Sequence, residues 1–191
     1  MQAKVANRLR ASSSDFLSVV WPAIESACGG GFIEPVESVT ESEFTKTLDI
    51  LGGIDAWQVI NDVGVRGIAS RVQWGNDWRT FTVRKALWSG GETEWHRIQR
   101  VQPLLDRGFI RAHLIVQAYL SGPPGAGSDL IAAYIIRAPD LYRFCDDEYE
   151  GVAWYPQDVP GGNTMAVFHV DRLKKSGCDV REIHPQAERA A

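Results

Sequence analysis

The fold of this chain is decided by residues 54–88, which read IDAWQVINDVGVRGIASRVQWGNDWRTFTVRKALW. Apolar and polar residues alternate over three runs, 54–60, 65–74 and 78–88, and a period of two is typical of β-strands. Short segments rich in Asn, Asp and Gly separate the runs, and connections of that length favour antiparallel hairpins. The stretch therefore predicts three successive strands joined by tight turns.

Helical and strand patterns continue on both sides of this stretch. Before it, apolar residues recur at helical spacing over 16–28, with Pro22 at a start or kink, and an extended piece follows at 32–39. Two later runs, 113–120 and 130–138, are too apolar for strands with one face in water. The remaining segments are assigned as helices at 93–105, 138–149 and 171–177, strands at 163–170 and 178–183, and a Pro/Gly-rich loop at 156–162. This order predicts an α/β fold with a central mixed β-sheet flanked by helices.

The length and composition favour one compact domain. A chain of 191 residues suits a single core, and we expect residues 1–13 to be a flexible leader, 14–183 a single α/β domain and 184–191 a loose tail. Three widely spaced Cys argue against a disulfide framework and against a structural zinc site. The sequence contains neither a run of about 20 apolar residues nor a secretory signal, so we expect a cytoplasmic protein without a membrane partner.

Charge is unevenly distributed along the chain. The formal net charge of −4 argues against indiscriminate binding to polyanions. Residues 66–111, however, contain nine Arg or Lys against four Asp or Glu. Such asymmetry can mark a nucleic-acid face, or it can reflect solvated strand and helix surfaces. Arg79, Arg84 and Lys85 are the candidate nucleic-acid-binding residues of this region.

Tryptophan residues interleave with the basic residues of the same region. Aromatic side chains mixed with basic ones suit stacking on unpaired bases, whereas period-two placement of large rings also builds ordinary cores. We assign Trp57 to the core and leave Trp78 and Trp88 open between the two roles.

Polar residues in an apolar setting mark a candidate site between the first two strands. Asp55 begins the first strand, and Arg71 and Gln73 share one face of the second because side chains alternate along a strand. Arg71 and Gln73 can therefore point toward Asp55. The structural alternative is an Asp55–Arg71 ion pair that braces two core strands, with Gln73 bonded to backbone.

The segments Gly53-Ile54-Asp55 and Gly67-Ile68-Ala69-Ser70-Arg71 resemble the PD-(D/E)XK nuclease superfamily, which includes restriction enzymes and Holliday-junction resolvases. In that superfamily an aspartate after Gly-Ile begins one strand, and the next strand carries an acid or Gln, any residue, and then Lys. The resemblance covers roughly residues 14–120 and implies a restriction-endonuclease-like fold. It matches Asp55 to the metal-binding aspartate, Ala69 to the acid and Arg71 to the lysine.

The resemblance implies metal-dependent hydrolysis of DNA with Mg²⁺ (or Mn²⁺) as the cofactor. Magnesium prefers carboxylate oxygens and water as ligands, and the candidate metal ligands are Asp55, Asp49 and Glu25. Glu41 and Glu43 are alternatives to Glu25 as the acid from the preceding helical region. We expect Asp49, Asp55, Arg71 and Gln73 to converge in one concavity at the edge of the sheet.

The chain departs from the superfamily pattern at two positions. Ala69 cannot bind a cation, and Arg71 cannot usefully exchange a proton, although a guanidinium can hold a phosphate through two hydrogen bonds. The catalytic candidates are therefore Asp55, Arg71 and Gln73, with Gln73 as a migrated carbonyl ligand.

Three functions remain open from the sequence. The first is metal-dependent DNA cleavage. The second is a catalytically inactive nuclease-fold protein that binds nucleic acid or a protein partner. The third is an interaction module without nucleic acid, with a homodimer or another protein as the partner.

Overall fold

A computed structural model of the chain describes residues 10–36, 52–107, 111–126 and 128–185. Backbone contacts divide the chain into two compact units, and each unit is assembled from separate segments. Unit 1 consists of Met1–Trp78, Arg111–Ile135 and Arg181–Ala191, and unit 2 consists of Arg79–Ile110 and Ile136–Val180. The expectation of a single domain over 14–183 stays a prediction.

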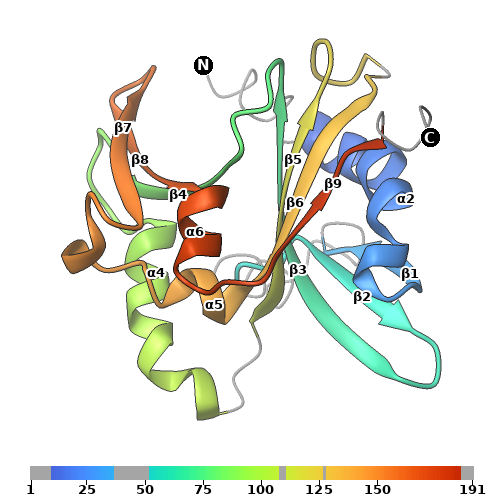
Figure 1. The fold of residues 1–191 in the computed structure, drawn as a ribbon, viewed down its shortest axis with the longest axis horizontal. Helices are drawn as coiled ribbons and strands as arrows, with labels where there is room; N and C mark the ends of the chain where they lie inside the picture. Colours follow the sequence, from blue (N-terminus) through green and yellow to red (C-terminus); the bar gives the residue numbers. More distant parts are fainter. Residues whose placement is uncertain (1–9, 37–51, 108–110, 127, 186–191) are drawn as a thin grey trace. The chain divides into compact units, whose positions relative to one another are not determined.

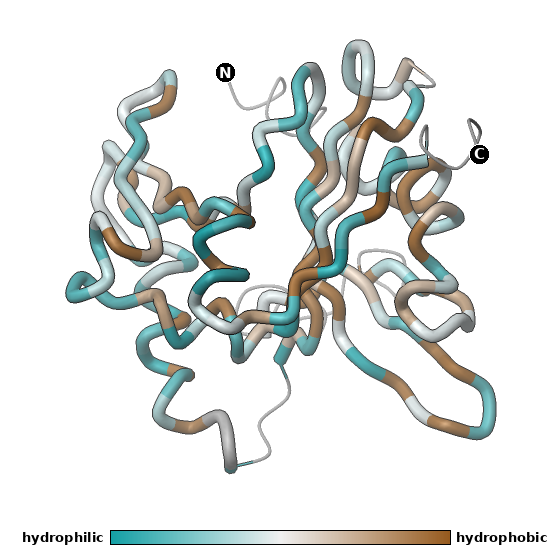
Figure 2. Tube along the Cα trace, in the orientation of Figure 1, coloured by the Kyte–Doolittle hydropathy of each residue, from teal (hydrophilic) through white to brown (hydrophobic). Residues whose placement is uncertain are grey.

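Unit 1 is built on a six-stranded sheet with the strand order β1-β2-β3-β5-β6-β9, which we call the central sheet (Figure 1). Its strands are β1 (Phe32–Pro35), β2 (Ala56–Ile60), β3 (Gly64–Trp74), β5 (Ala112–Leu120), β6 (Leu130–Arg137) and β9 (Val180–Ile183). Hydrophobic and hydrophilic residues alternate along the β2–β3 hairpin, as the period-two pattern predicts (Figure 2).

The central sheet is mixed. β2 pairs antiparallel with both β1 and β3, with Ala56 opposite Ile68, whereas β3 pairs parallel with β5, with Arg71 opposite Gln117. The pairing of β3 with β5 shifts register between Gly67 and Ile68. This arrangement confirms the prediction of an α/β fold with a central mixed sheet flanked by helices.

A helical layer packs on one face of the central sheet. It contains the π-helical turn η1 (Phe16–Val20), α2 (Trp21–Ile24) and the 3₁₀ turn η2 (Ser26–Cys28). Pro22 lies in the first turn of α2, where its missing N–H costs nothing, and the irregular helix before it agrees with the predicted kink. The buried cluster beneath this layer comprises Phe16, Val20, Trp21, Ile24, Cys28, Ile68, Val72, Leu114, Val116, Ala118, Leu120, Leu130, Ala133 and Ile135.

The chain is already helical over residues 10–15, so the leader expected over 1–13 is structured at 10–13. Within the described ranges, no helix combines the length and the hydrophobicity that crossing a bilayer requires.

Unit 2 is built on a three-stranded sheet with the order β4-β8-β7, which we call the small sheet. Its strands are β4 (Thr80–Ala86), β7 (Trp154–Val159) and β8 (Asn163–His169), and both pairings are antiparallel. The helical segments of its described residues are α4 (Glu94–Val101), η4 (Gln102–Arg107), α5 (Ala138–Tyr142), η5 (Asp147–Tyr149) and α6 (Val170–Lys175).

Two predictions about the strands were wrong. β4 was expected to continue the hairpin series beside β3, but it pairs with β8, because β5 occupies the edge of β3 in parallel register. The loop predicted at 156–162 begins as strand β7, which ends at Val159, and only the remaining residues form a turn. Pro156 lies inside β7, which is an edge strand of the small sheet, and an edge strand tolerates a residue without an N–H donor.

Candidate functional site

Asp55 lies immediately before β2 and is exposed to solvent. Its Oδ2 accepts a hydrogen bond of 2.5 Å from the backbone N–H of Ser70 on β3, and its own N–H donates to the carbonyl of Ile68 at 2.9 Å. The sequence predicted that Asp55 begins this strand and faces the neighbouring strand. The Asp55 carboxylate therefore lies beside the residue that precedes Arg71.

Arg71 and Gln73 lie on the face of β3 opposite the helical layer. Ile68 and Val72 belong to the cluster under that layer, and alternation directs residues 69, 71 and 73 to the other face. Arg71 and Gln73 are both half-buried. The convergence of Asp55, Arg71 and Gln73 in one concavity remains a prediction.

Gln117 is a polar residue of this face that sequence reasoning missed. It lies opposite Arg71 in the parallel pairing of β3 with β5, and it is 1% exposed. Tyr119 lies opposite Gln73 in the same pairing and is fully buried. A glutamine inside the apolar run 113–120 was the available signal. Most buried side-chain amides are hydrogen-bonded, so a glutamine is rarely buried for packing alone.

The candidate metal ligands are not assembled within the described part of the chain. Glu25 follows α2 and belongs to the helical layer, on the opposite face of the sheet from Arg71. Asp49, Glu41 and Glu43 lie outside the described residues. Across ranges 10–36, 52–107, 111–126 and 128–185, no group of three or more His, Cys, Asp or Glu residues is placed to hold a metal ion.

His113 is a titratable group near the beginning of β5. The backbone N–H of Gly67 donates to its Nδ1 at 3.2 Å, which requires that this nitrogen carry no proton. Desolvation of the ring lowers the pKa of His113 below its ordinary value, and the nearby charges of Arg111 and Arg66 lower it further. His113 is thus kept neutral as a hydrogen-bond acceptor.

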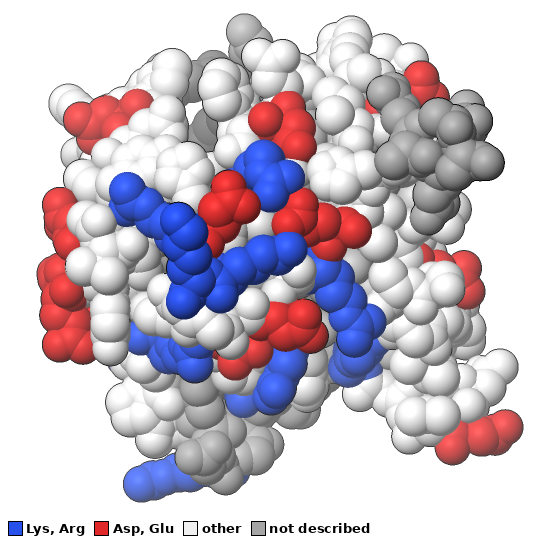
Figure 3. Space-filling model, in the orientation of Figure 1, with Lys and Arg blue, Asp and Glu red and all other residues white. Residues whose placement is uncertain are grey.

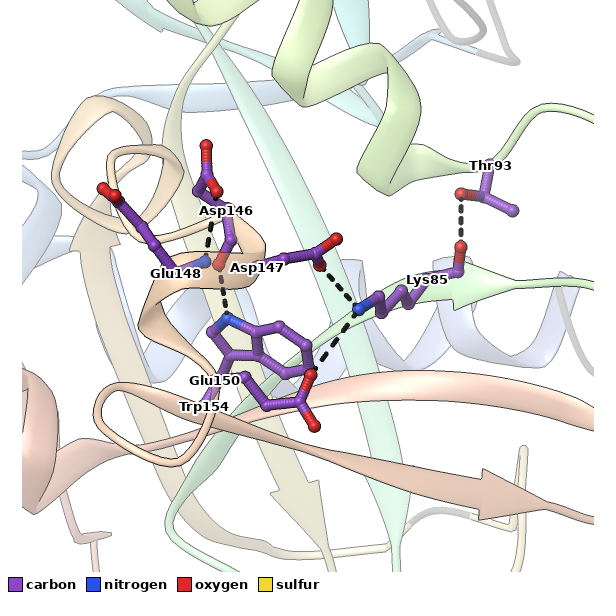
Figure 4. A network of polar contacts seen from close by, with 7 residues as sticks. All are labelled: Lys85, Thr93, Asp146, Asp147, Glu148, Glu150 and Trp154. Carbon is purple, nitrogen blue, oxygen red and sulfur yellow. Dashed lines mark hydrogen bonds and ion pairs between the residues drawn. The ribbon is translucent and has the colours of Figure 1, made fainter.

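Two of the three predicted nucleic-acid-binding residues are paired with acids in unit 2. Arg79 forms an ion pair with Asp171 at 3.0 Å. Lys85 forms one with Asp147 at 2.7 Å, and Glu150 lies 4.0 Å from the same ammonium (Figure 4). Arg84, on the opposite face of β4 from Val83, is exposed, and its backbone N–H donates a hydrogen bond to Glu94 Oε2 at 3.2 Å.

The Lys85 ammonium also lies over aromatic rings. Its Nζ is 4.2 Å from the ring centroid of Trp154 and 5.1 Å from that of Trp95, two buried rings that pack edge to face. Contacts of this kind attract a cation to the ring face. Lys85 is therefore held by its own unit, and a phosphate would have to displace Asp147 to reach it.

Basic and acidic side chains are mixed on one face of the protein. Lys and Arg side chains stand next to Asp and Glu side chains on the face drawn in Figure 3. Trp78 and Trp88, which the sequence left open between core and surface, are 62% and 80% exposed.

The three cysteines are buried, free thiols. Burial raises the pKa of Cys28, Cys145 and Cys178, most strongly that of Cys145, where the charge of Glu94 adds to the effect. A protonated, buried thiol is a poor nucleophile.

The sequence matches neither a protein-family model nor a curated protein. A solved structure that matches in fold is the crystal structure of the restriction endonuclease BglI bound to its DNA recognition sequence, at 14% sequence identity and a TM-score of 0.35. The match covers 75% of this chain and 58% of the length of that chain. A similarity at this level carries no argument about what this chain does.

Proposed function

We propose that the chain is a divergent nuclease-fold protein that binds DNA, with Arg71 holding a backbone phosphate. A guanidinium binds phosphate oxygens through two parallel hydrogen bonds, which suits phosphate recognition without proton transfer. The proposal rests on the hydrogen bond between Asp55 and the backbone of Ser70, because it brings the strand-opening aspartate next to the residue before Arg71. Asp55 and Arg71 are two of the three positions that the superfamily resemblance matches.

The residues present do not fit a magnesium ion well. Asp55 offers one carboxylate, and one of its oxygens already accepts the Ser70 N–H. Ala69 offers no ligand, and Glu25 belongs to the layer on the other face. Phosphate binding is therefore better supported by the described residues than catalytic turnover.

Metal-dependent hydrolysis of DNA phosphodiesters is the second candidate function. The exposed Asp55 carboxylate, at the position that the superfamily uses for its metal, favours it. Hydrolysis would require Mg²⁺ or Mn²⁺ and further oxygen ligands. Asp49, outside the described residues, is the sequence candidate for one of them.

A cleavage assay separates the two candidates. Plasmid, linear duplex and single-stranded DNA are incubated with micromolar protein and either Mg²⁺ or Mn²⁺. The binding proposal expects no cleavage with either metal. If the protein hydrolyses DNA, the wild type should cleave it. The Asp55→Ala variant should then lose cleavage and retain its affinity for DNA.

An affinity measurement tests the role of Arg71. Because charge-assisted hydrogen bonds to phosphate are lost, Arg71→Gln should weaken DNA binding about tenfold. Arg137→Gln is the matched control, since the Arg137 side chain is 69% exposed and Arg137 is the last residue of β6, which does not pair with β3. If Arg71→Gln lowers the free energy of unfolding but leaves DNA affinity unchanged, the structural ion pair with Asp55 is the better interpretation.

Absence of salt-dependent DNA binding by the wild type would leave only a protein partner or a homodimer.

A further inference from the structure

The small sheet has two chemically different faces. Phe81, Phe168 and Trp154 are buried and lie opposite one another in the strand pairings, which defines the core face. Alternation directs the intervening residues to the other face, which we call the outer face. The outer face comprises Thr80, Thr82 and Arg84 of β4, Asn163, Met165, Val167 and His169 of β8, and Tyr155, Gln157 and Val159 of β7. Thr80 and Val167 are buried, at 4% and 2% exposed, so the solvent-exposed part of this face is made by the other residues.

Two rings on the outer face form a stacked pair. Tyr155 lies opposite Val167 on β8, and His169 follows Val167 on the same face two residues later. The two ring centroids are 5.2 Å apart with an interplanar angle of 29°. Both residues are half-buried, so part of this flat surface faces solvent.

Arg84 is the Arg or Lys residue among the strand residues of the outer face, and its backbone N–H donates a hydrogen bond to Glu94 Oε2 at 3.2 Å. Arg84 lies in one row with Met165 and Gln157, and both Arg84 and Gln157 are exposed. Among the strand residues of this face, all of which the structure describes, there is no Asp or Glu. Asp158, the acid of β7, lies in register with Thr164 on the core side and accepts a hydrogen bond from its hydroxyl at 2.8 Å.

An exposed indole lies at the far end of the outer face. The side-chain oxygen of Asn163 accepts a hydrogen bond from the Trp88 backbone N–H at 3.2 Å. A side chain at Gly162 would overlap the indole of Trp88, so the ring packs directly against the β7–β8 turn. Because Trp88 is 80% exposed, it presents apolar surface to solvent in a defined position.

We infer that the outer face of the small sheet binds an unpaired stretch of nucleic acid. Tyr155, His169 and Trp88 would stack on bases, while Arg84 and Gln157 would contact the phosphates and sugars between them. Aromatic platforms interrupted by cations are the arrangement that single strands require, because every base has a stacking face and every linkage a negative charge. This inference rests on the proposed function in taking nucleic acid as the ligand, and it narrows the substrate class to DNA with an unpaired segment.

The probe is fluorescently labelled oligothymidylate, compared with a duplex of the same length, with affinity measured by anisotropy. Tyr155→Ala and Trp88→Ala should each weaken binding of the single strand about tenfold, because a stacked base loses its aromatic partner. Duplex binding should change less than threefold, since paired bases are not free to stack. Tyr155→Phe should retain the affinity, which separates loss of stacking from loss of folding.

Tyr149→Ala is the matched control, because Tyr149 belongs to η5 and not to the small sheet. It should leave single-strand affinity unchanged. Unchanged single-strand binding by both Tyr155→Ala and Trp88→Ala overturns the inference while the role of Arg71 stands. Equal weakening of single-strand and duplex binding also overturns it. If the wild type binds neither probe, the proposed function itself fails.

Discussion

Asp15 shows how one side chain joins three segments of unit 1. It is 4% exposed, and its Oδ2 accepts hydrogen bonds from the Trp74 indole at 2.9 Å and from the Gly125 backbone N–H at 3.0 Å. The carboxylate thus links the first helix to the end of β3 and to the loop between β5 and β6. Removing it leaves two N–H donors without the buried acceptor that joins them.

Asp15→Ala should therefore lower the free energy of unfolding by about 3 kcal/mol. Urea denaturation followed by tryptophan fluorescence measures the change. Ser18→Ala is the control in the same helical segment, because the Ser18 hydroxyl is exposed and donates only to the Ser14 carbonyl. The control should change stability by less than about 0.5 kcal/mol. Equal values for the two variants would contradict the role assigned to Asp15.

At the residue scale, the sequence predicted part of the candidate site. The motif resemblance found Asp55, because an aspartate at the start of a strand after Gly-Ile is a local pattern. The motif resemblance missed Gln117. Gln117 lies opposite Arg71 only because β3 pairs in parallel with β5, and no short sequence pattern indicates that pairing. Strand alternation gives the face of a residue but not its neighbour on the next strand.

The connection from η2 to β1 contains a glycine, Gly31, that has no room for a side chain. Gly31 has φ +89°, and a side chain there would overlap the carbonyl oxygen of Val59 on β2. Gly30, at φ +80°, has open space where its side chain would be. The two positions share the backbone conformation and differ in contact with β2.

Gly30→Ala should destabilise the protein by about 1–2 kcal/mol, the cost of the left-handed backbone alone. Gly31→Ala should cost about 2 kcal/mol more, because β1 must move away from β2. Urea denaturation of both variants tests this. If the free energies of unfolding of the two variants differ by less than about 0.5 kcal/mol, β1 can move away from β2 without loss of stability.

At the element scale, periodicity predicted the type of most segments and failed on their partners. β2, β3, β5, β6 and β8 were all expected as strands. Alternation along β4 is compatible with any antiparallel neighbour, so the sequence could not assign it to a second sheet. β7 was missed because Pro156 and the following turn residues are typical of loops, although an edge strand accepts them.

The balance of charges over the whole molecule should limit how strongly salt controls DNA binding. The net charge is −4, and Arg79, Lys85 and Arg100 each pair with an acid of unit 2. These three cations are therefore less available to replace the counterions of DNA. We expect a plot of log affinity against log salt concentration to have a slope of about −2 to −3.

Arg84→Gln should reduce the magnitude of that slope by about 1, because one phosphate contact is lost. Lys85→Gln is the comparison from the adjacent position. It should leave the slope unchanged, since Asp147 and the Trp154 ring already hold the ammonium. Titrations between about 50 and 200 mM salt provide the measurement. If Lys85→Gln also reduces the magnitude of the slope, the Lys85 ammonium leaves Asp147 and contacts DNA in the complex.

The interleaving of the two units along the chain bears on how the protein is made. β9, the outermost strand beside β6, comes from Val180–Ile183, after all of unit 2 has been synthesised. A nascent chain therefore exposes one border of its main sheet until Val180–Ile183 has emerged from the ribosome. During that interval the free border could pair with other polypeptides, so fast elongation or a chaperone should raise the yield of correctly folded product.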